Sequence, residues 1–341
     1  MPRAPIDNPK IKDVAALAGV SVTTVSRYLN GHPYIRPEIR EKIQAAIDSL
    51  GYTPSSIARS LVRKKTDLIG VIVSDVSVSF FSTILGRIEE RASKAGYAIL
   101  VGNIMEDLDK ELRYLKVFKG LRVDGLILMH ERTTPQIRRF LKSLGFPVVL
   151  SSVNPPELDY PSINIDDEAA TADAVAYLAG LGHRRIALIG GNLSEKSSGL
   201  NRYQGYIHGL ERAGLILDKS IVRFGNFKMS DGYRLMGELM ESGPLPDAVL
   251  ALSDDMAAGA LLKLADAGIA VPSKISVMGF DDSVVASMMR PALTTIHQPI
   301  DDIGSLSVDI LIRRIEEGES MDGKVVLEHR VVERSSCRSM V

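Results

Sequence analysis

Short polar side chains and one arginine recur at helical spacing near residue 25, where they could read DNA. Ser21 is a favourable N-cap for a helix over Val22 to Asn30. Val22 and Thr23 fall in the first turn of that helix and could touch base edges or a thymine methyl group. Arg27 follows one turn later and could form a bidentate pair with guanine. Groups for phosphate oxygens are offered by Thr24, Ser26, Asn30 and Tyr34.

Two further helices are needed to position these side chains. Apolar residues at Ile11, Val14, Ala15 and Ala18 fall on one face of a helix that Gly19 would end. The short turn 19–21 then leads into the helix that begins at Val22, which gives the helix-turn-helix layout. A third helix is predicted from Pro37, with Gly51 as its stop. Spacing alone leaves an ordinary three-helix bundle with a polar surface as an alternative.

The distribution of charge favours the DNA interpretation. The chain of 341 residues has a formal net charge of only −1. Residues 1–65 nevertheless hold eleven Lys and Arg against five Asp and Glu, a net charge of +6, which leaves −7 for the remainder. A basic head on an acidic body is expected if only the head meets a polyanion.

Beyond residue 67 the pattern changes to repeated strands and helices. Apolar runs of strand length begin near 68, 97, 124, 147, 185, 248 and 275, with helical stretches between them. Such runs are typical of parallel strands that are buried on both faces. The pattern restarts near Ser162, so we expect an α/β body of two doubly wound lobes, whose strands present their carboxyl ends to a shared cleft.

Several segments together resemble the lac repressor family of bacterial transcription regulators. They are IKDVAALAGVSVTTVSRYLNG in the head, then DGLIL, LGHRRIALIGG, LSDDMAAGAL, ISVMGFDDS and RPALTTIHQPIDDIG in the body. The resemblance covers about residues 10–335. It implies a small all-α helix-turn-helix head over residues 1–51, a hinge over 52–66, and a body over 67–341 that is similar to periplasmic sugar-binding proteins and dimerises.

The resemblance also implies roles for individual residues. The base-reading positions of the family fall on Val22, Thr23 and Arg27, and the hinge leucine that wedges into the minor groove falls on Leu61. Arg202 and Asp281 would grip sugar hydroxyls, and Phe80 and Phe227 would supply flat faces for a ring. The complete set of implied effector contacts is Ser79, Phe80, Ser152, Ser198, Arg202, Phe227, Ser253, Asp281 and Gln298.

Other classes of protein fit the sequence less well. The turn after Gly190 and Gly191 lacks a dinucleotide-binding fingerprint, and no Walker, HExxH or GxSxG motif is present, so we expect no enzyme and no catalytic residues. The single cysteine and the scattered histidines predict no metal site, and no cofactor is expected. No apolar run is long enough for a membrane span, and the N-terminus lacks an apolar signal core, which predicts a cytoplasmic protein.

The expected function is therefore that of a sequence-specific transcription regulator, most simply a repressor. Its partners would be double-stranded DNA with a near-palindromic operator and a small, sugar-like effector, with a purine or a protein co-effector as the second choice. No leucine heptad follows the last predicted strand, over Val325 to Val332, which favours a homodimer. The alternative is a sugar-binding transport or sensory protein without DNA activity. That alternative would not need the basic head.

Overall fold

The computed structural model describes residues 9–29, 32–53, 65–318 and 323–340. The chain divides into two compact units, Met1–Thr66 and Asp67–Val341. The smaller unit is the head and the larger unit is the body, and each is described by itself.

The described residues of the head form three helices around a small apolar core. Helix α1 (Ile11–Ala18) ends at Gly19, whose φ of 66° is a left-handed conformation that glycine adopts without strain. Helix α2 (Val22–Leu29) follows after three residues, and α3 (Pro37–Leu50) packs with both. All three contribute buried side chains to one cluster, which consists of Val14, Ala15, Ala18, Val25, Ile43 and Ala46.

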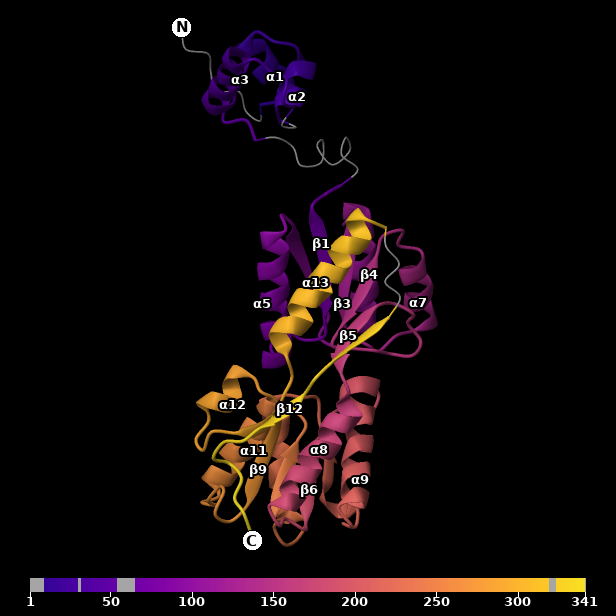
Figure 1. Ribbon diagram of the computed structural model, residues 1–341, viewed down its shortest axis with the longest axis vertical. Helices are drawn as coiled ribbons and strands as arrows, with labels where there is room; N and C mark the ends of the chain where they lie inside the picture. The colour runs from indigo at the N-terminus through magenta and orange to yellow at the C-terminus, as the bar shows by residue number, and fades with distance from the viewer. Residues whose placement is uncertain (1–8, 30–31, 54–64, 319–322, 341) are drawn as a thin grey trace. The chain divides into compact units, whose positions relative to one another are not determined.

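The first lobe of the body is a six-stranded parallel sheet in the order β11-β5-β4-β3-β1-β2. Helices α5 and α13 bury apolar side chains against one face of this sheet, and α6 and α7 against the other. Figure 1 shows α13 lying across the sheet. The strands are β1 (Leu68–Val73), β2 (Ala98–Asn103), β3 (Gly125–Met129), β4 (Val148–Ser151), β5 (Ser162–Ile165) and β11 (Lys324–Leu327). The helices are α5 (Ser79–Lys94), α6 (Leu108–Leu121), α7 (Pro135–Lys142) and α13 (Ile300–Glu316).

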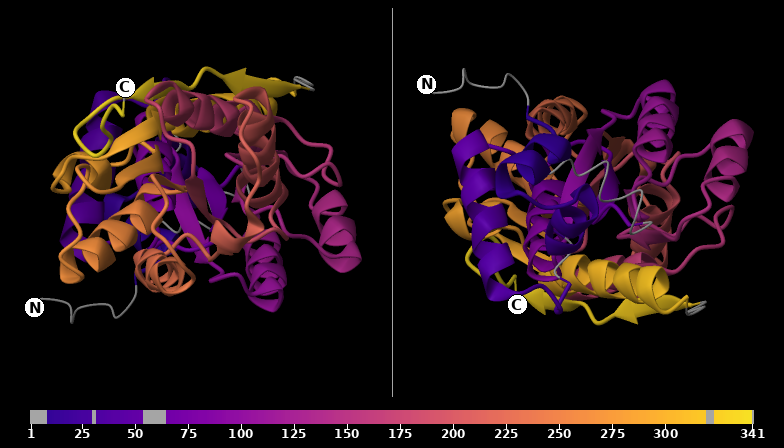
Figure 2. Two further views of the ribbon diagram at one scale, coloured as in Figure 1. Left: turned by 90° about the horizontal axis from the view of Figure 1, so that it is seen from below. Right: turned by 90° about the horizontal axis from the view of Figure 1, so that it is seen from above.

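The second lobe repeats this plan with the order β12-β10-β9-β8-β6-β7, in which only β12 is antiparallel to its neighbour. Seen from the two ends, helices lie on both sides of the sheets (Figure 2). The strands are β6 (Ile186–Gly190), β7 (Val222–Phe224), β8 (Ala248–Ala251), β9 (Ser276–Asp281), β10 (Thr294–His297) and β12 (Arg330–Val332). The α-helices are α8 (Asp167–Gly180), α9 (Arg202–Arg212), α10 (Met229–Glu241), α11 (Asp254–Asp266) and α12 (Val284–Met288), with a π-helix η1 (Lys196–Asn201) and a 3-10 helix η2 (Lys219–Ile221).

The two lobes are not consecutive halves of the chain, as a restart near Ser162 had predicted. Strand β5 begins at Ser162 but completes the first sheet, and the chain enters the second lobe only with α8. It returns to the first lobe at α13 and crosses again between β11 and β12. The single strand expected over Val325 to Val332 is thus two strands, one in each sheet. Three short crossings therefore join the lobes.

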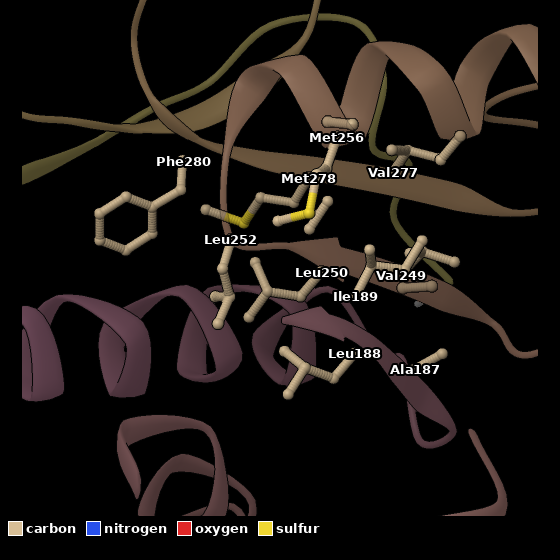
Figure 3. Close-up of a cluster of buried hydrophobic side chains, with 14 of the residues drawn as sticks. Ala187, Leu188, Ile189, Val249, Leu250, Leu252, Met256, Val277, Met278 and Phe280 are labelled. Carbon is tan, nitrogen blue, oxygen red and sulfur yellow. The ribbon is translucent and has the colours of Figure 1, made fainter. Parts of the chain in front are cut away.

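Buried apolar strands form the centre of each lobe, as their composition predicts. In the second lobe β6, β8 and β9 supply Leu188, Leu250 and Met278, which are completely buried together with Met256 of α11 (Figure 3). The expectation of burial on both faces is wrong for β2, since this strand forms the edge of its sheet and only Gly102 of its six residues is buried. In the part of the chain that the structure describes, no helix combines the length and the apolar character that a bilayer crossing needs.

Candidate functional site

Helix α2 of the head presents the residues expected to read DNA. The Oγ atom of Ser21 accepts a hydrogen bond from the backbone N–H of Thr24 at 3.1 Å, so it caps the helix as predicted. Val25 is buried in the core, which orients the opposite face of α2 outward. Val22, Thr23 and Arg27 lie on that outer face and are exposed, Val22 to 45%. An arginine and two small side chains are thus available to a major groove.

The remaining predicted DNA contacts are less uniform. The hydroxyl of Thr24 is engaged with Ser21 Oγ at 2.8 Å, and Ser26 is half-buried. Tyr34 is 90% exposed in the segment between α2 and α3. Asn30 and Leu61 lie outside the described residues, as does most of the expected hinge.

The body contains a cavity between its two lobes. Its lining comes from the carboxyl ends of strands, where ligands of doubly wound sheets bind. Ser74, His130 and Ser152 follow β1, β3 and β4 of the first lobe, while Ser253 and Asp281 lie at the ends of β8 and β9 of the second. The other lining residues are Val78, Phe80, Phe81, Glu131, Val153, Glu195, Ser198, Arg202 and Phe227.

Arg202 is the central cation of the second-lobe wall. It is 4% exposed at the start of α9. Its Nε donates to Asp167 Oδ1 at 2.7 Å and its Nη1 to the carbonyl of Leu252 at 2.8 Å. The guanidinium also lies 3.8 Å from the ring centroid of Phe280. These contacts fix its plane and leave other N–H groups of its fork for a ligand.

Asp281 lies beside Arg202 and is also 4% exposed. Its Oδ1 accepts a hydrogen bond from Gln298 Nε2 at 2.7 Å and is 3.7 Å from Arg202 Nη1. Burial raises the pKa of this carboxyl well above its usual range, against the opposing effect of Arg202. A hydroxyl group donated by a ligand would offset the missing solvation.

A second group of titratable residues also lines the cavity. Glu131 is 6% exposed and accepts hydrogen bonds from the backbone N–H of Ser197, at 3.1 and 3.0 Å, and from its hydroxyl at 2.7 Å. Glu195 accepts from the hydroxyl of Ser198 at 2.7 Å. Burial, and then the charge of Glu106, raises the pKa of Glu195 to about 7.

Polar contacts join the two lobes around the cavity. Ser79 of the first lobe donates from its N–H and its hydroxyl to Asp255 Oδ2 of the second, at 2.9 and 2.7 Å. Lys228 forms an ion pair with Asp75 at 2.9 Å. The contacts of Glu131 with Ser197 cross between lobes as well. These contacts hold the two lobes together around the cavity.

The backbone is strained at three residues of the lining. Ser152, Phe227 and Asp281 have φ values of 60°, 61° and 121°, which side-chain-bearing residues seldom adopt. Such conformations concentrate at functional sites because the surrounding structure must maintain them. Phe227 lies against Gly191, where an added Cβ atom would come within 1.8 Å of its ring. Gly191 therefore leaves the space that this aromatic wall occupies.

The structure brings seven of the nine predicted effector residues into the cavity wall. They are Phe80, Ser152, Ser198, Arg202, Phe227, Ser253 and Asp281. Ser79 does not line the cavity, because both of its donors are directed to Asp255. Gln298 does not line it either, and instead orients Asp281 from behind.

Sequence reasoning missed three titratable residues of the wall, His130, Glu131 and Glu195. His130 and Glu131 directly follow β3, and Glu195 lies in the segment after β6. Their positions at the carboxyl ends of strands were the available signal, since that edge faces the cleft. Val78 also lines the cavity and gives it an apolar contact.

The chain matches two known domain families. Residues 10–55 match the bacterial regulatory proteins of the lacI family, and residues 175–337 match the periplasmic binding protein-like domain. It is 36% identical to catabolite control protein A of Priestia megaterium over 332 residues, which cover 97% of this chain and 100% of that protein.

Solved structures show the same architecture. The lac repressor dimer bound to operator and the anti-inducer ONPF is 30% identical with a TM-score of 0.87, and the match covers 97% of this chain and 100% of that one. A complex of the transcriptional regulator CelR with cellobiose is 31% identical with a TM-score of 0.74, covering 96% of this chain and 100% of the other.

Proposed function

This chain belongs to the lacI family of bacterial regulatory proteins, whose members are DNA-binding transcription regulators and not enzymes, and from that premise we propose that it is a sequence-specific repressor controlled by a sugar-like effector. The repressor would act on DNA in the cytoplasm. The observation that carries the proposal is the presence, in one chain, of an exposed reading helix and a cavity walled by both lobes.

We assign the reading of bases to Val22, Thr23 and Arg27, because these residues share the exposed face of α2. Thr24, Ser26, Asn30 and Tyr34 would contact phosphates. One helix covers too few base pairs for specificity, so a homodimer would place two heads on a near-palindromic operator. The lac repressor dimer on its operator supports this arrangement. For Leu61 the resemblance alone supports a wedge into the minor groove.

The effector would lie between the lobes. Phe227 and Phe80 supply apolar faces, Arg202 and Asp281 supply paired donors and acceptors, and Ser152, Ser198 and Ser253 supply hydroxyl groups. Ser79 and Gln298 support this wall indirectly. A sugar presents both ring faces and hydroxyls, and the cellobiose complex of the relative CelR is in line with such a ligand.

The function is tested by measuring operator binding of the full chain. Sites selected from random DNA should be near-palindromic, and a sugar that stabilises the protein in a thermal-shift screen should change its affinity for those sites. Residues 67–341 alone should bind the sugar but not the operator. Undiminished operator binding by residues 67–341 would contradict the assignment of DNA recognition to the head.

The variant Asp281→Ala separates sensing from DNA binding. Removal of this buried acceptor leaves ligand hydroxyls unpaired, at a cost of about 1–3 kcal/mol. We expect the variant to keep the operator affinity of the unliganded parent and to lose its response at the same effector concentration. A full response by the variant would place the sensor elsewhere.

A further inference from the structure

The wall of the cavity has more acidic than basic side chains. Three carboxylates line it, those of Glu131, Glu195 and Asp281, and the cations of the lining are Arg202 and His130. Whether a ligand meets a neutral or a negative wall depends on how far these two cations are already neutralised.

Both cations are neutralised by carboxylates that stand behind the wall. Arg202 Nε is 2.7 Å from Asp167 Oδ1, and Asp167 is not part of the lining. His130 Nδ1 is 3.0 Å from Oε2 of Glu111, whose side chain is fully buried. The positive charges of Arg202 and His130 are therefore largely balanced by Asp167 and Glu111, and little of either charge remains to attract a ligand.

Glu131 and Glu195 have no comparable partners. Among the described residues neither carboxylate forms a salt bridge, and the hydrogen bonds they accept come from Ser197 and Ser198, which are neutral donors. The two glutamates also repel one another, and burial raises the pKa of both. They lie on facing lobes, since Glu131 follows β3 and Glu195 follows β6. Two acidic side chains, which a bound cation would keep ionised, thus face the cavity from the two lobes.

A metal ion does not fit this pair of side chains. No group of three His, Cys, Asp or Glu side chains within the described ranges could hold one. An anion is disfavoured by the same carboxylates. The Nε2 atom of the neighbouring His130 is buried and lies 3.7 Å from Glu106 Oε2, and it makes no hydrogen bond to the residues described.

We propose that the effector carries a protonated amine, which binds between Glu131 and Glu195 while its ring lies against Phe227 and its hydroxyls meet Arg202 and Asp281. The ligand class is thus an amine-bearing polyol, such as an amino sugar. This inference rests on the proposed function of the cavity as the effector site.

Matched ligand pairs test the proposal on the full chain. We choose D-glucosamine with D-glucose, D-galactosamine with D-galactose, and D-mannosamine with D-mannose, and add D-glucose 6-phosphate as an anionic probe. By calorimetric titration at pH 7.5, at least one amine should bind roughly tenfold or more tighter than its neutral counterpart, and the phosphate should not bind. The proposal is overturned if no amine exceeds its neutral counterpart, or if the phosphate binds as well as the amines.

The variant Glu195→Gln locates the amine. Glutamine retains an acceptor for Ser198 but removes the charge, so the preference for amine over neutral sugar should fall by about tenfold. Glu211→Gln, on an exposed part of α9, is the control with the same chemical change and should keep the preference. An unchanged preference in Glu195→Gln contradicts the placement of the amine. If that variant does not fold, Glu131→Gln makes the same test from the other lobe.

Operator titrations distinguish this inference from the function on which it rests. If an amine binds as expected but operator affinity does not change, the ligand class stands and the effector role fails. If a neutral sugar alone changes operator affinity, the effector role stands and the charge argument is wrong.

Discussion

Arg27 illustrates how one exposed side chain can carry sequence information. It stands on α2 with Val22 and Thr23, outside the core that Val25 anchors. A guanidinium there can form two parallel hydrogen bonds with guanine, which no other base offers in the same arrangement. Charge alone would attract DNA without discriminating among sequences.

We therefore predict that Arg27→Ala relaxes specificity at one base pair of each half-site. The loss should cost roughly 1–3 kcal/mol on the selected operator and less on random DNA. Lys42→Ala removes the same charge from an exposed position on α3 and is the control, since it should affect all sequences equally. Binding measured on single-base operator variants checks the difference. Equal losses on operator and random DNA for Arg27→Ala would speak against base reading.

His130 predicts a pH dependence of stability. Burial alone would lower its pKa, but Glu106 and Glu111 outweigh that effect and raise the pKa to about 9. Because the folded-state pKa lies above the unfolded value of about 6.5, this stabilisation is present below pH 6.5 and is lost as the pH rises through 9.

Between pH 7 and 10, the parent should lose roughly 2 kcal/mol more unfolding free energy than His130→Gln does. Denaturant titrations of both proteins across this range measure the difference. Comparing the two proteins cancels other groups that titrate above pH 9. Parallel pH profiles would show that His130 is not held as a cation in the folded protein.

At the scale of elements, most helices and central strands could be predicted from the sequence. Gly19, Gly51 and Pro37 mark helix ends in the head, and apolar runs mark β1, β3 and β6 in the body. Strand β7 has only three half-exposed residues, Val222 to Phe224, so it leaves no apolar run to detect. The assignment of β5 and β11 to the first sheet depends on pairing across long sequence separations, which periodicity does not encode.

Prediction from the sequence has the same limit for the residues around the cavity. The family pattern identified Arg202 and Asp281, but the charge balance of the wall depends on Asp167 and Glu111, which lie behind it. Ser79 appears in the family motif as a ligand contact, yet its donors face Asp255 of the other lobe. Such second-layer contacts arise from the packing of helices and loops that are distant in sequence.

The contact between the helices α5 and α11 leads to a prediction about lobe closure. Ser79 at the start of α5 donates twice to Asp255 in the first turn of α11. Asp255→Asn replaces a charged acceptor by a neutral one, which should weaken the closed arrangement by about 1–2 kcal/mol. Effector affinity should then fall roughly 5–30-fold, since a ligand held by both lobes needs them closed.

Calorimetric titration measures that affinity, and small-angle scattering of the unliganded protein should show a larger radius of gyration for Asp255→Asn. Asp302→Asn, in the exposed first turn of α13, is the matched control and should change neither quantity. Parent-like affinity in Asp255→Asn would mean that the Ser79 contact does not hold the lobes together.

For the whole molecule, the arrangement of the chain determines what a ligand can transmit. The lobes are joined by three short crossings, between β5 and α8, between β10 and α13, and between β11 and β12. Each lobe has its own sheet and core, so the crossings permit a rigid rotation of one lobe against the other. In a dimer, that rotation would alter the distance between the two chain segments that lead to the heads.

Thermodynamic linkage then requires the coupling to be reciprocal. If the effector changes operator affinity by some factor, the operator must change effector affinity by the same factor, because both report one free energy of coupling. Typical couplings are about 1–3 kcal/mol, or roughly 5–150-fold. The measurement is a pair of titrations on the full chain, operator with and without saturating effector, and effector with and without saturating operator. Asp255→Asn shifts the balance between open and closed lobes, so it should alter both factors together. Unequal factors in the parent would show that the two ligands do not act on one shared equilibrium of the lobes, and that the cavity regulates something other than the fit of the heads to DNA.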